Sequence, residues 1–185
     1  MDNAIAEASA LLARFLLYGW VMRVYIPVTS TELFALSQRP DGAYWDIPAG
    51  VVHGVTPQLK SEFPDADEEE LEWEASNAAA DDSLALVLGN AEVSPVRAIL
   101  SVDVPDKSIS APLNSGLAPS SLNMTAVPDT KIAAVHVDEP EVAEIIKSWR
   151  AAGAPTPAQR REVDDAHLLW YDGSELDQLK SDVLT

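Results

Sequence analysis

Three histidines are the side chains of this 185-residue chain best suited to proton transfer or metal binding. They are His53, His136 and His167, and each lies in or beside a segment with the composition of a β-strand. Two have an acid nearby, because Asp138 follows His136 and Asp165 precedes His167. Histidine with carboxylate is what a general base or a metal centre needs. No two histidines have the short spacing of helical metal ligands, so a structural role is the simpler interpretation.

Asp103 and Asp106 are the acids best placed for catalysis, because they lie at the end of the most apolar strand-like segment. Ligands of open sheets bind beyond the carboxyl ends of the strands. If the protein is an enzyme, we expect its site on the sheet face, with His53, His136 and Asp103 as the catalytic candidates. The alternative is that the two acids only begin a turn.

Several classes of site lack the residues they need. The chain has no cysteine, which excludes disulfides, thiolate metal ligands and a cysteine nucleophile. It has no glycine-rich phosphate loop and no nucleophile elbow around a serine. We therefore predict no cofactor and no metal, and our preferred hypothesis is a protein that is not an enzyme.

The densest charged segment is an acidic run at 62–74, with Trp73 inside it. Its acids are Glu62, Asp65, Asp67, Glu68, Glu69, Glu70, Glu72 and Glu74. The run lacks the alternating ligands and glycine of a calcium loop. An exposed tryptophan among acids is a candidate binding hot spot. We therefore predict Glu68, Glu69, Glu72 and Trp73 as partner-binding residues, the alternative being a solvated helix face.

The formal net charge of −18 restricts the partners that the protein can have. It argues against binding to nucleic acid or to an anionic membrane, both of which attract lysine and arginine. No apolar run is long enough to span a bilayer. The charge is compatible with an unknown, basic protein partner, or with mutual repulsion that keeps a soluble protein apart from its neighbours. We expect a cytoplasmic protein.

Alternating strand and helix patterns describe most of the chain. Strands are expected at 22–28, 43–56, 97–104, 124–127, 131–137 and 168–171. Helices are expected at about 29–38, 67–88, 138–150, 158–166 and 175–183. The segment 105–123 is rich in serine, proline and alanine, and we predict a long, mobile loop there.

Two stretches, 23–36 and 133–145, share the pattern of a strand, a polar cap and a short helix. Their matched apolar positions are Ile26 with Val135, Val28 with Val137, Leu33 with Val142 and Leu36 with Ile145. We therefore predict an α+β, ferredoxin-like fold with two duplicated βαβ halves, a mainly antiparallel sheet and helices on one face. A small doubly wound sheet is the alternative.

We expect residues 1–21 to be an N-terminal extension and residues 22–185 to form a single domain. The apolar segment 8–22 contains Arg14 and has an acidic flank, unlike a secretory signal. It is either an amphipathic helix, with one face formed by Ile5, Ala8, Leu12 and Phe15, or lies upstream of a true start at Met22, which we favour. An open sheet edge in the domain would also permit a homodimer.

Six short stretches carry a resemblance to a known family. They are Met22–Pro27, Gly54–Pro57, Asp67–Glu72, Ser101–Asp106, Ala134–Glu139 and His167–Asp172. On these residues the chain resembles a family of uncharacterised actinobacterial proteins, a domain of unknown function, over roughly residues 22–180. The resemblance implies that related proteins begin at the position of Met22. It implies no activity, substrate or cofactor.

Overall fold

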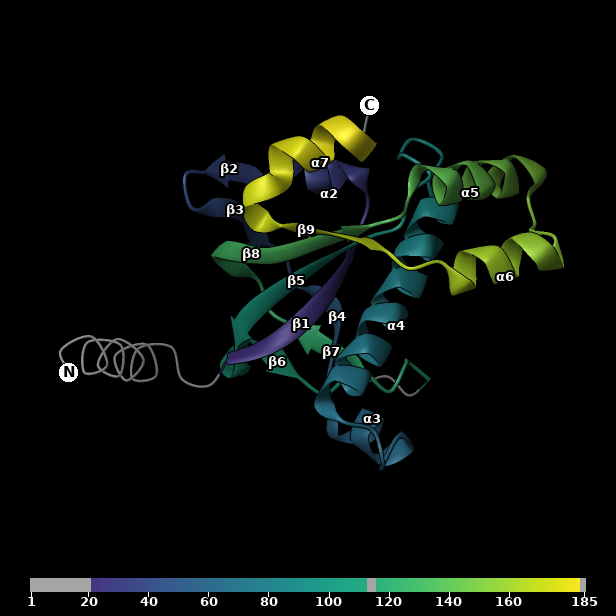
Figure 1. Cartoon of the computed structure of the whole chain (residues 1–185). Helices are drawn as coiled ribbons and strands as arrows, with labels where there is room; N and C mark the ends of the chain where they lie inside the picture. Colours follow the sequence, from purple (N-terminus) through teal and green to yellow (C-terminus); the bar gives the residue numbers. More distant parts are fainter. Residues whose placement is uncertain (1–20, 113–115, 184–185) are drawn as a thin grey trace.

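The structure, a computed structural model, describes residues 21–112 and 116–183, which form one sheet with helices packed around it (Figure 1). The strands are β1 (Val21–Val28), β2 (Ser37–Arg39), β3 (Gly42–Ile47), β4 (Gly50–Gly54), β5 (Ala98–Pro105), β6 (Ile109–Ser110), β7 (Ser121–Met124), β8 (Val127–Val137) and β9 (Leu169–Asp172). The helices are α2 (Ser30–Ala35), α3 (Pro57–Glu62), α4 (Glu68–Gly89), α5 (Pro140–Ala152), α6 (Pro157–Asp165) and α7 (Leu176–Val183).

The strands lie side by side in the order β2-β3-β8-β5-β1-β4-β7-β6. Every pair of neighbouring described strands is antiparallel. β8 is the longest strand, and its second half also pairs with β9. The prediction of an α+β protein with a mainly antiparallel sheet is confirmed. The alternative of a doubly wound sheet is wrong, since such sheets are mostly parallel.

Both faces of the central strands are buried under helices. Val24 and Ile26 of β1 pack in a cluster with residues of α2 and α7. Tyr25, which points to the opposite face, packs in a second cluster with residues of α3 and α4. The expectation of helices on one face is therefore wrong. The first five residues of β5, 98–102, are all buried, as in a strand covered on both sides.

A third cluster lies beside the sheet, where α5 and α6 pack on the last turns of α4 (Figure 1). Its largest members are Trp149 and Ile146 of α5, with Val163 of α6 and Leu84 and Val87 of α4. α5 ends at Gly153, which has a φ of 77° and closes the helix in the left-handed conformation that glycine favours. The cluster fixes α6 next to α4, and this pairing creates the groove described below.

The two repeated strands lie at equal levels on either side of β5. Ile26 and Val135 are both opposite Leu100, and Val28 and Val137 are both opposite Ala98. The helices that follow these strands lie in different clusters, since α2 packs in the first cluster and α5 in the third. The strands of the two copies are therefore equivalent in the sheet, whereas their helices are not.

Local signals located most elements within a few residues. Asp67 caps α4 in a capping box with Glu70, close to the predicted start of that helix. The expected loop at 105–123 instead contains β6 and the first residues of β7, which pair with each other. The hypotheses on residues 1–20 concern residues outside those described. Within the described part, no helix is both apolar and long enough to cross a bilayer.

Candidate functional site

A groove of about 660 Å³ lies between α4 and α6 on the sheet face that α4 covers. Residues of β5 and β8 line it together with side chains from both helices and from the segment between α6 and β9. The lining residues are Trp73, Ser76, Asn77, Ala80, Asp81, Arg97, Ile99, His136, Arg160, Asp164, Asp165, Ala166, His167 and Leu168.

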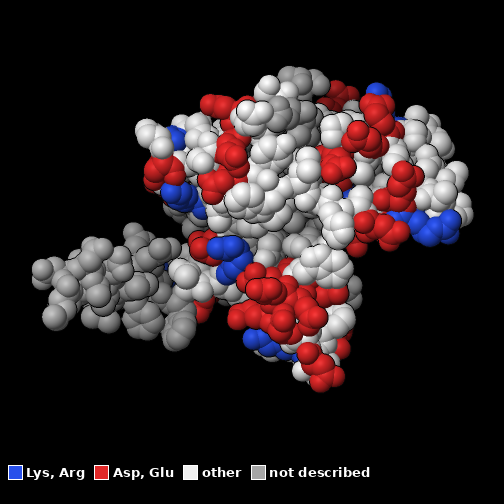
Figure 2. All heavy atoms as spheres, in the orientation of Figure 1, with Lys and Arg blue, Asp and Glu red and all other residues white. Residues whose placement is uncertain are grey.

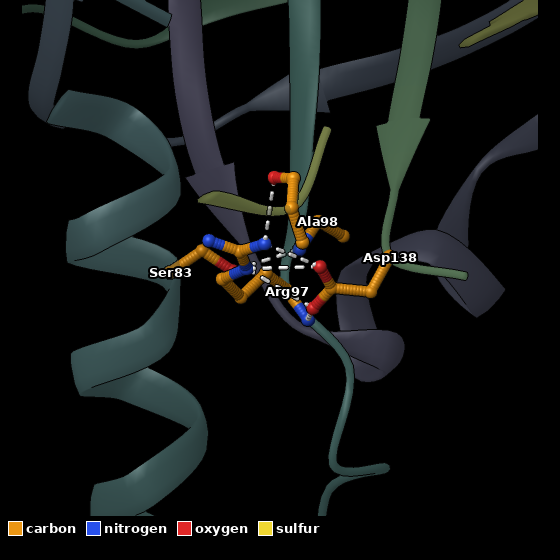
Figure 3. Close-up of polar contacts among 5 residues, drawn as sticks. Ser83, Arg97, Ala98 and Asp138 are labelled. Atoms are coloured by element: carbon orange, nitrogen blue, oxygen red, sulfur yellow. Dashed lines mark hydrogen bonds and ion pairs between the residues drawn. The ribbon is translucent and has the colours of Figure 1, made fainter. Parts of the chain in front are cut away.

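Ser83 fixes α4, one wall of the groove, to the sheet (Figure 3). Its hydroxyl donates a hydrogen bond of 2.8 Å to the carbonyl oxygen of Val28 and accepts one of 2.9 Å from the backbone nitrogen of Ala98. Ser83 therefore joins α4 to the end of β1 and to the start of β5. Buried Ala75 and Ala79 permit the close approach of helix and sheet.

Arg97 and Asp138 form a buried ion pair at the same end of the sheet (Figure 3). The Arg97 Nη2 donates to Asp138 Oδ1 at 2.7 Å, and the backbone nitrogen of Arg97 donates to Oδ2 at 2.8 Å. Arg97 Nη2 also donates to the carbonyl oxygen of Ala166 at 3.3 Å. The pair thus links the start of β5, the end of β8 and the segment after α6, and so holds the second wall in place.

His136 lies at the floor of the groove, hydrogen-bonded to Ser101. Its Nε2 is 2.8 Å from the Ser101 Oγ. Burial, with a contribution from the positive charge of Arg23, lowers the pKa of His136 from 6.5 to about 4, so the imidazole is neutral near pH 7. Ser101 is only 3% exposed and does not line the groove. The pair therefore presents an imidazole, and not a serine nucleophile, to a ligand.

His53 serves as a buried connector elsewhere on the same side of the sheet. It is 1% exposed, with its Nδ1 2.8 Å from the Ser120 Oγ and its Nε2 3.1 Å from a carboxylate oxygen of Asp82. It joins β4 to α4 and to the segment before β7. These contacts agree with a structural role for this histidine.

Asp103 is paired with Arg23 on the neighbouring strand, through contacts of 2.6 Å and 3.1 Å from Nε and Nη2. Among the interactions of the described residues, no hydrogen bond joins His53, His136 and Asp103 to one another. The three candidates thus have separate partners on β4, β8 and β5. Asp106, the other acid, is exposed and begins a short 3₁₀ turn.

The acidic residues at the first turns of α4 do not all face the same way. Glu68 and Glu69 are exposed, and the acidic patch at the first turns of α4 is prominent in Figure 2. Glu72 is half-buried and accepts a hydrogen bond of 3.2 Å from the Tyr25 hydroxyl. Burial and the negative charge of Glu72 raise the pKa of Tyr25. Glu72 therefore faces the sheet and not a free helix surface.

Trp73 stands between two acid-lined hollows. Its side chain is 53% exposed, and it lines both the groove and a second hollow of about 540 Å³. The groove contains Asp81, Asp164 and Asp165. The second hollow is lined by Glu62, Phe63, Pro64, Asp65, Ala66, Glu70, Trp73 and Glu74. An exposed indole with carboxylates on both sides is a suitable contact for a cation.

Comparison with known proteins gives one result for this chain. A family model described as "Family of unknown function (DUF6912)" matches residues 22–179. The chain belongs to this family. The match confirms the resemblance to a domain of unknown function and covers both walls and the floor of the groove in this DUF6912 protein. No curated protein and no solved structure matches the chain.

Sequence reasoning on this DUF6912 chain named Trp73 and His136, which both line the groove, but missed other residues that build it. Ser83, Arg97, Ser101 and Arg160 were not candidates, because each acquires its function only by meeting a residue distant in sequence. Arg97 beside a buried strand carried the best available signal, since a charge at such a position requires a partner. In the described ranges, no group of three or more histidine, aspartate or glutamate side chains is placed to hold a metal ion.

Proposed function

We propose that this protein binds a basic segment of a partner protein across the surface formed by Trp73 and the acids on either side of it. The observation that carries the proposal is the position of Trp73. Its half-exposed indole lies between two hollows, and both are lined by carboxylates. Burial of a large aromatic side chain is favourable, and an indole exposed between two hollows can be buried by a partner. The position of Trp73 therefore favours a binding function.

The chemistry of the surface selects a cationic partner. Lysine and arginine are attracted to the face of an indole ring, and nearby carboxylates add to the attraction. Glu68 and Glu69 lie on the exposed side of the same helix, and the net charge of −18 accelerates the approach of a positive partner. Glu72 supports the surface from beneath through its bond to Tyr25. Nucleic acid and anionic membranes are disfavoured by the same charge.

The test compares two tryptophan variants in a binding titration. The probe is a fluorescent, extended peptide with alternating arginine and glycine residues, measured by anisotropy at 50 mM and 500 mM NaCl. Trp73→Ala is expected to weaken binding about tenfold, because it removes the stacking contact. Trp170→Ala is the matched control, since Trp170 is 60% exposed but lines neither hollow, and it is expected to change the affinity less than about twofold.

High salt is expected to weaken the binding of the peptide, because the contacts are exposed and screened. Equal affinities of the Trp73→Ala variant and the parent protein would refute the proposal, as would binding that does not depend on salt. A partner isolated from cells on the parent protein should carry a basic segment and be lost from the Trp73→Ala variant.

An enzyme with His53, His136 and Asp103 on the sheet face stays a prediction. Among the described residues, the hydrogen bond between Ser101 and His136 is a contact that favours it. A fluorophosphonate probe would label Ser101 if that serine reacted as a nucleophile. We expect no labelling, since its hydroxyl is buried.

We also propose that β1 with α2 and β8 with α5 are two copies of one unit in a duplicated, ferredoxin-like fold. The equal register of the two strands on β5 supports this origin. The helices have then diverged in their packing. A cytoplasmic location, an actinobacterial origin and a homodimer through a sheet edge stay predictions. Sedimentation of the purified chain would test the last.

A further inference from the structure

The groove between α4 and α6 carries an excess of negative charge. Three carboxylates line it, from Asp81, Asp164 and Asp165, against two guanidinium groups. One of these, that of Arg97, is already neutralised by buried Asp138. Only the guanidinium of Arg160 is left to balance the three carboxylates, so the groove has a surplus of two negative charges.

Arg160 spans the groove from one wall to the other. Its Nε donates to Asp164 on its own helix at 2.8 Å, and its Nη2 lies 3.6 Å from Asp81 on α4. The guanidinium also lies 5.7 Å from the centre of the Trp149 ring. These contacts place a cation between acids from the two walls. The space between the walls is therefore suited to a guanidinium group.

The Arg160 contacts are of a kind that another cation can replace. The Arg160 side chain is 47% exposed, and Asp81 and Asp164 are 64% and 40% exposed. Ion pairs this exposed contribute little to stability and exchange readily with competing charges. By contrast, the Arg97 pair is 5% and 0% exposed, so an incoming cation does not reach Asp138. Arg160 is thus the exchangeable cation of the groove.

We propose that this groove binds an arginine side chain of the partner, and that the Arg160 side chain occupies the same position in the free protein. The inference rests on the proposed function, because the same partner segment crosses Trp73 and enters the groove. Arginine fits better than lysine, since its planar group can contact carboxylates of both walls and lie against an aromatic ring. Binding of the partner then requires that at least the contact between Arg160 and Asp81 is broken.

The experiment compares two neighbouring arginines that differ in position but not in charge. Arg160→Gln removes the bridging cation. Arg161→Gln removes the same charge one residue later, where the side chain is exposed and has no ion pair among the described residues. Both variants are titrated with the arginine peptide and with a peptide in which lysine replaces every arginine.

Arg160→Gln is expected to tighten binding of the arginine peptide about threefold or more relative to Arg161→Gln, and to tighten the lysine peptide less. Equal effects of the two variants on the affinity would contradict the binding of an arginine in the groove, because they would reflect net charge alone. Weaker binding by Arg160→Gln would overturn it also. These outcomes are separate from the proposed function, which fails if Trp73→Ala leaves the affinity unchanged. Thermal melting of both variants verifies that each is folded.

Discussion

At the scale of single residues, Arg97 and Asp138 are the charges most completely removed from water. Their side chains are 5% and 0% exposed, and each is satisfied by the other and by backbone groups. A buried pair of this kind contributes little net stability against an apolar pair of equal volume, but losing one partner leaves an isolated charge. The pair therefore matters most as a positional constraint on the groove.

Asp138→Asn is expected to destabilise the protein by about 3–5 kcal/mol, because Arg97 would stay buried without an opposing charge. Urea denaturation measures the change in the free energy of unfolding. The control is Asp129→Asn, which removes an acid from the exposed pair of Arg39 and Asp129 and should cost less than about 1 kcal/mol. Similar losses from the two variants would contradict the burial argument.

His136 links stability to pH at the same scale. Its pKa is lowered from 6.5 to about 4 in the folded protein, so the unfolded chain takes up a proton before the native state does. The folded state must then lose stability as the pH falls from 6.5 towards 4, and it recovers this stability as the pH rises.

Replacing His136 by Gln should flatten this part of the stability profile, with a difference from the parent protein that changes by about 3 kcal/mol between pH 7 and pH 4. Denaturation with urea at several pH values measures both curves, and the carboxylates that titrate in both proteins cancel in the difference. A constant difference across the range would mean that the folded protein does not lower this pKa.

At the scale of elements, α4 is the helix on which the proposed site depends. It supplies Trp73 and Asp81 and covers Tyr25 and Ile99 of the sheet. The middle of its buried face consists of small residues, Ala75, Ala79, Ala80 and Ser83, so its contact with the strands there depends on close approach. Ser83 supplies a buried polar contact in that interface.

Ser83→Ala is expected to cost about 2–3 kcal/mol, because the backbone nitrogen of Ala98 loses its acceptor and the carbonyl of Val28 loses a donor. Ser76→Ala, on the same helix, removes only an exposed bond to the Trp73 carbonyl and should cost less than about 0.5 kcal/mol. Urea denaturation compares the two. Faster hydrogen exchange at Ala98 in the first variant would locate the effect, and equal losses would refute it.

At the scale of the whole molecule, the excess of acids opposes folding through self-repulsion. The net charge of −18 is carried by 30 acids against 12 lysines and arginines. Repulsion between exposed charges is screened by salt, so added salt should stabilise the compact state. The same salt weakens the proposed contacts with a basic partner. Salt should therefore raise the stability of the fold while it lowers the affinity for the partner.

The melting temperature is expected to rise by a few degrees between 20 mM and 300 mM NaCl, since screening relieves the repulsion. The triple variant Glu68→Gln, Glu69→Gln, Glu70→Gln should show a smaller rise, because part of the repulsion is already removed. Calorimetry or circular dichroism measures both proteins. A melting temperature that falls with salt in the parent protein would indicate that ion pairs outweigh repulsion.

The amino-acid sequence by itself determined the elements whose signals are local. The acidic residues of the run predicted a helix that begins at about residue 67, and the alternation in β1 predicted a strand, because both signals depend only on neighbours in the chain. Serine and proline in the segment before β7 concealed β6, since so short a strand exists only through its partner.

Only the tertiary structure decided which side chains meet. Arg97 contacts Asp138, His136 contacts Ser101, and Arg160 reaches Asp81, each across a large distance in sequence. These contacts depend on the register of β5 and β8 and on helices that cover both faces of β5. Register and layer order are set by burial of the whole sheet, which is a non-local property, so short-range patterns could not specify the groove.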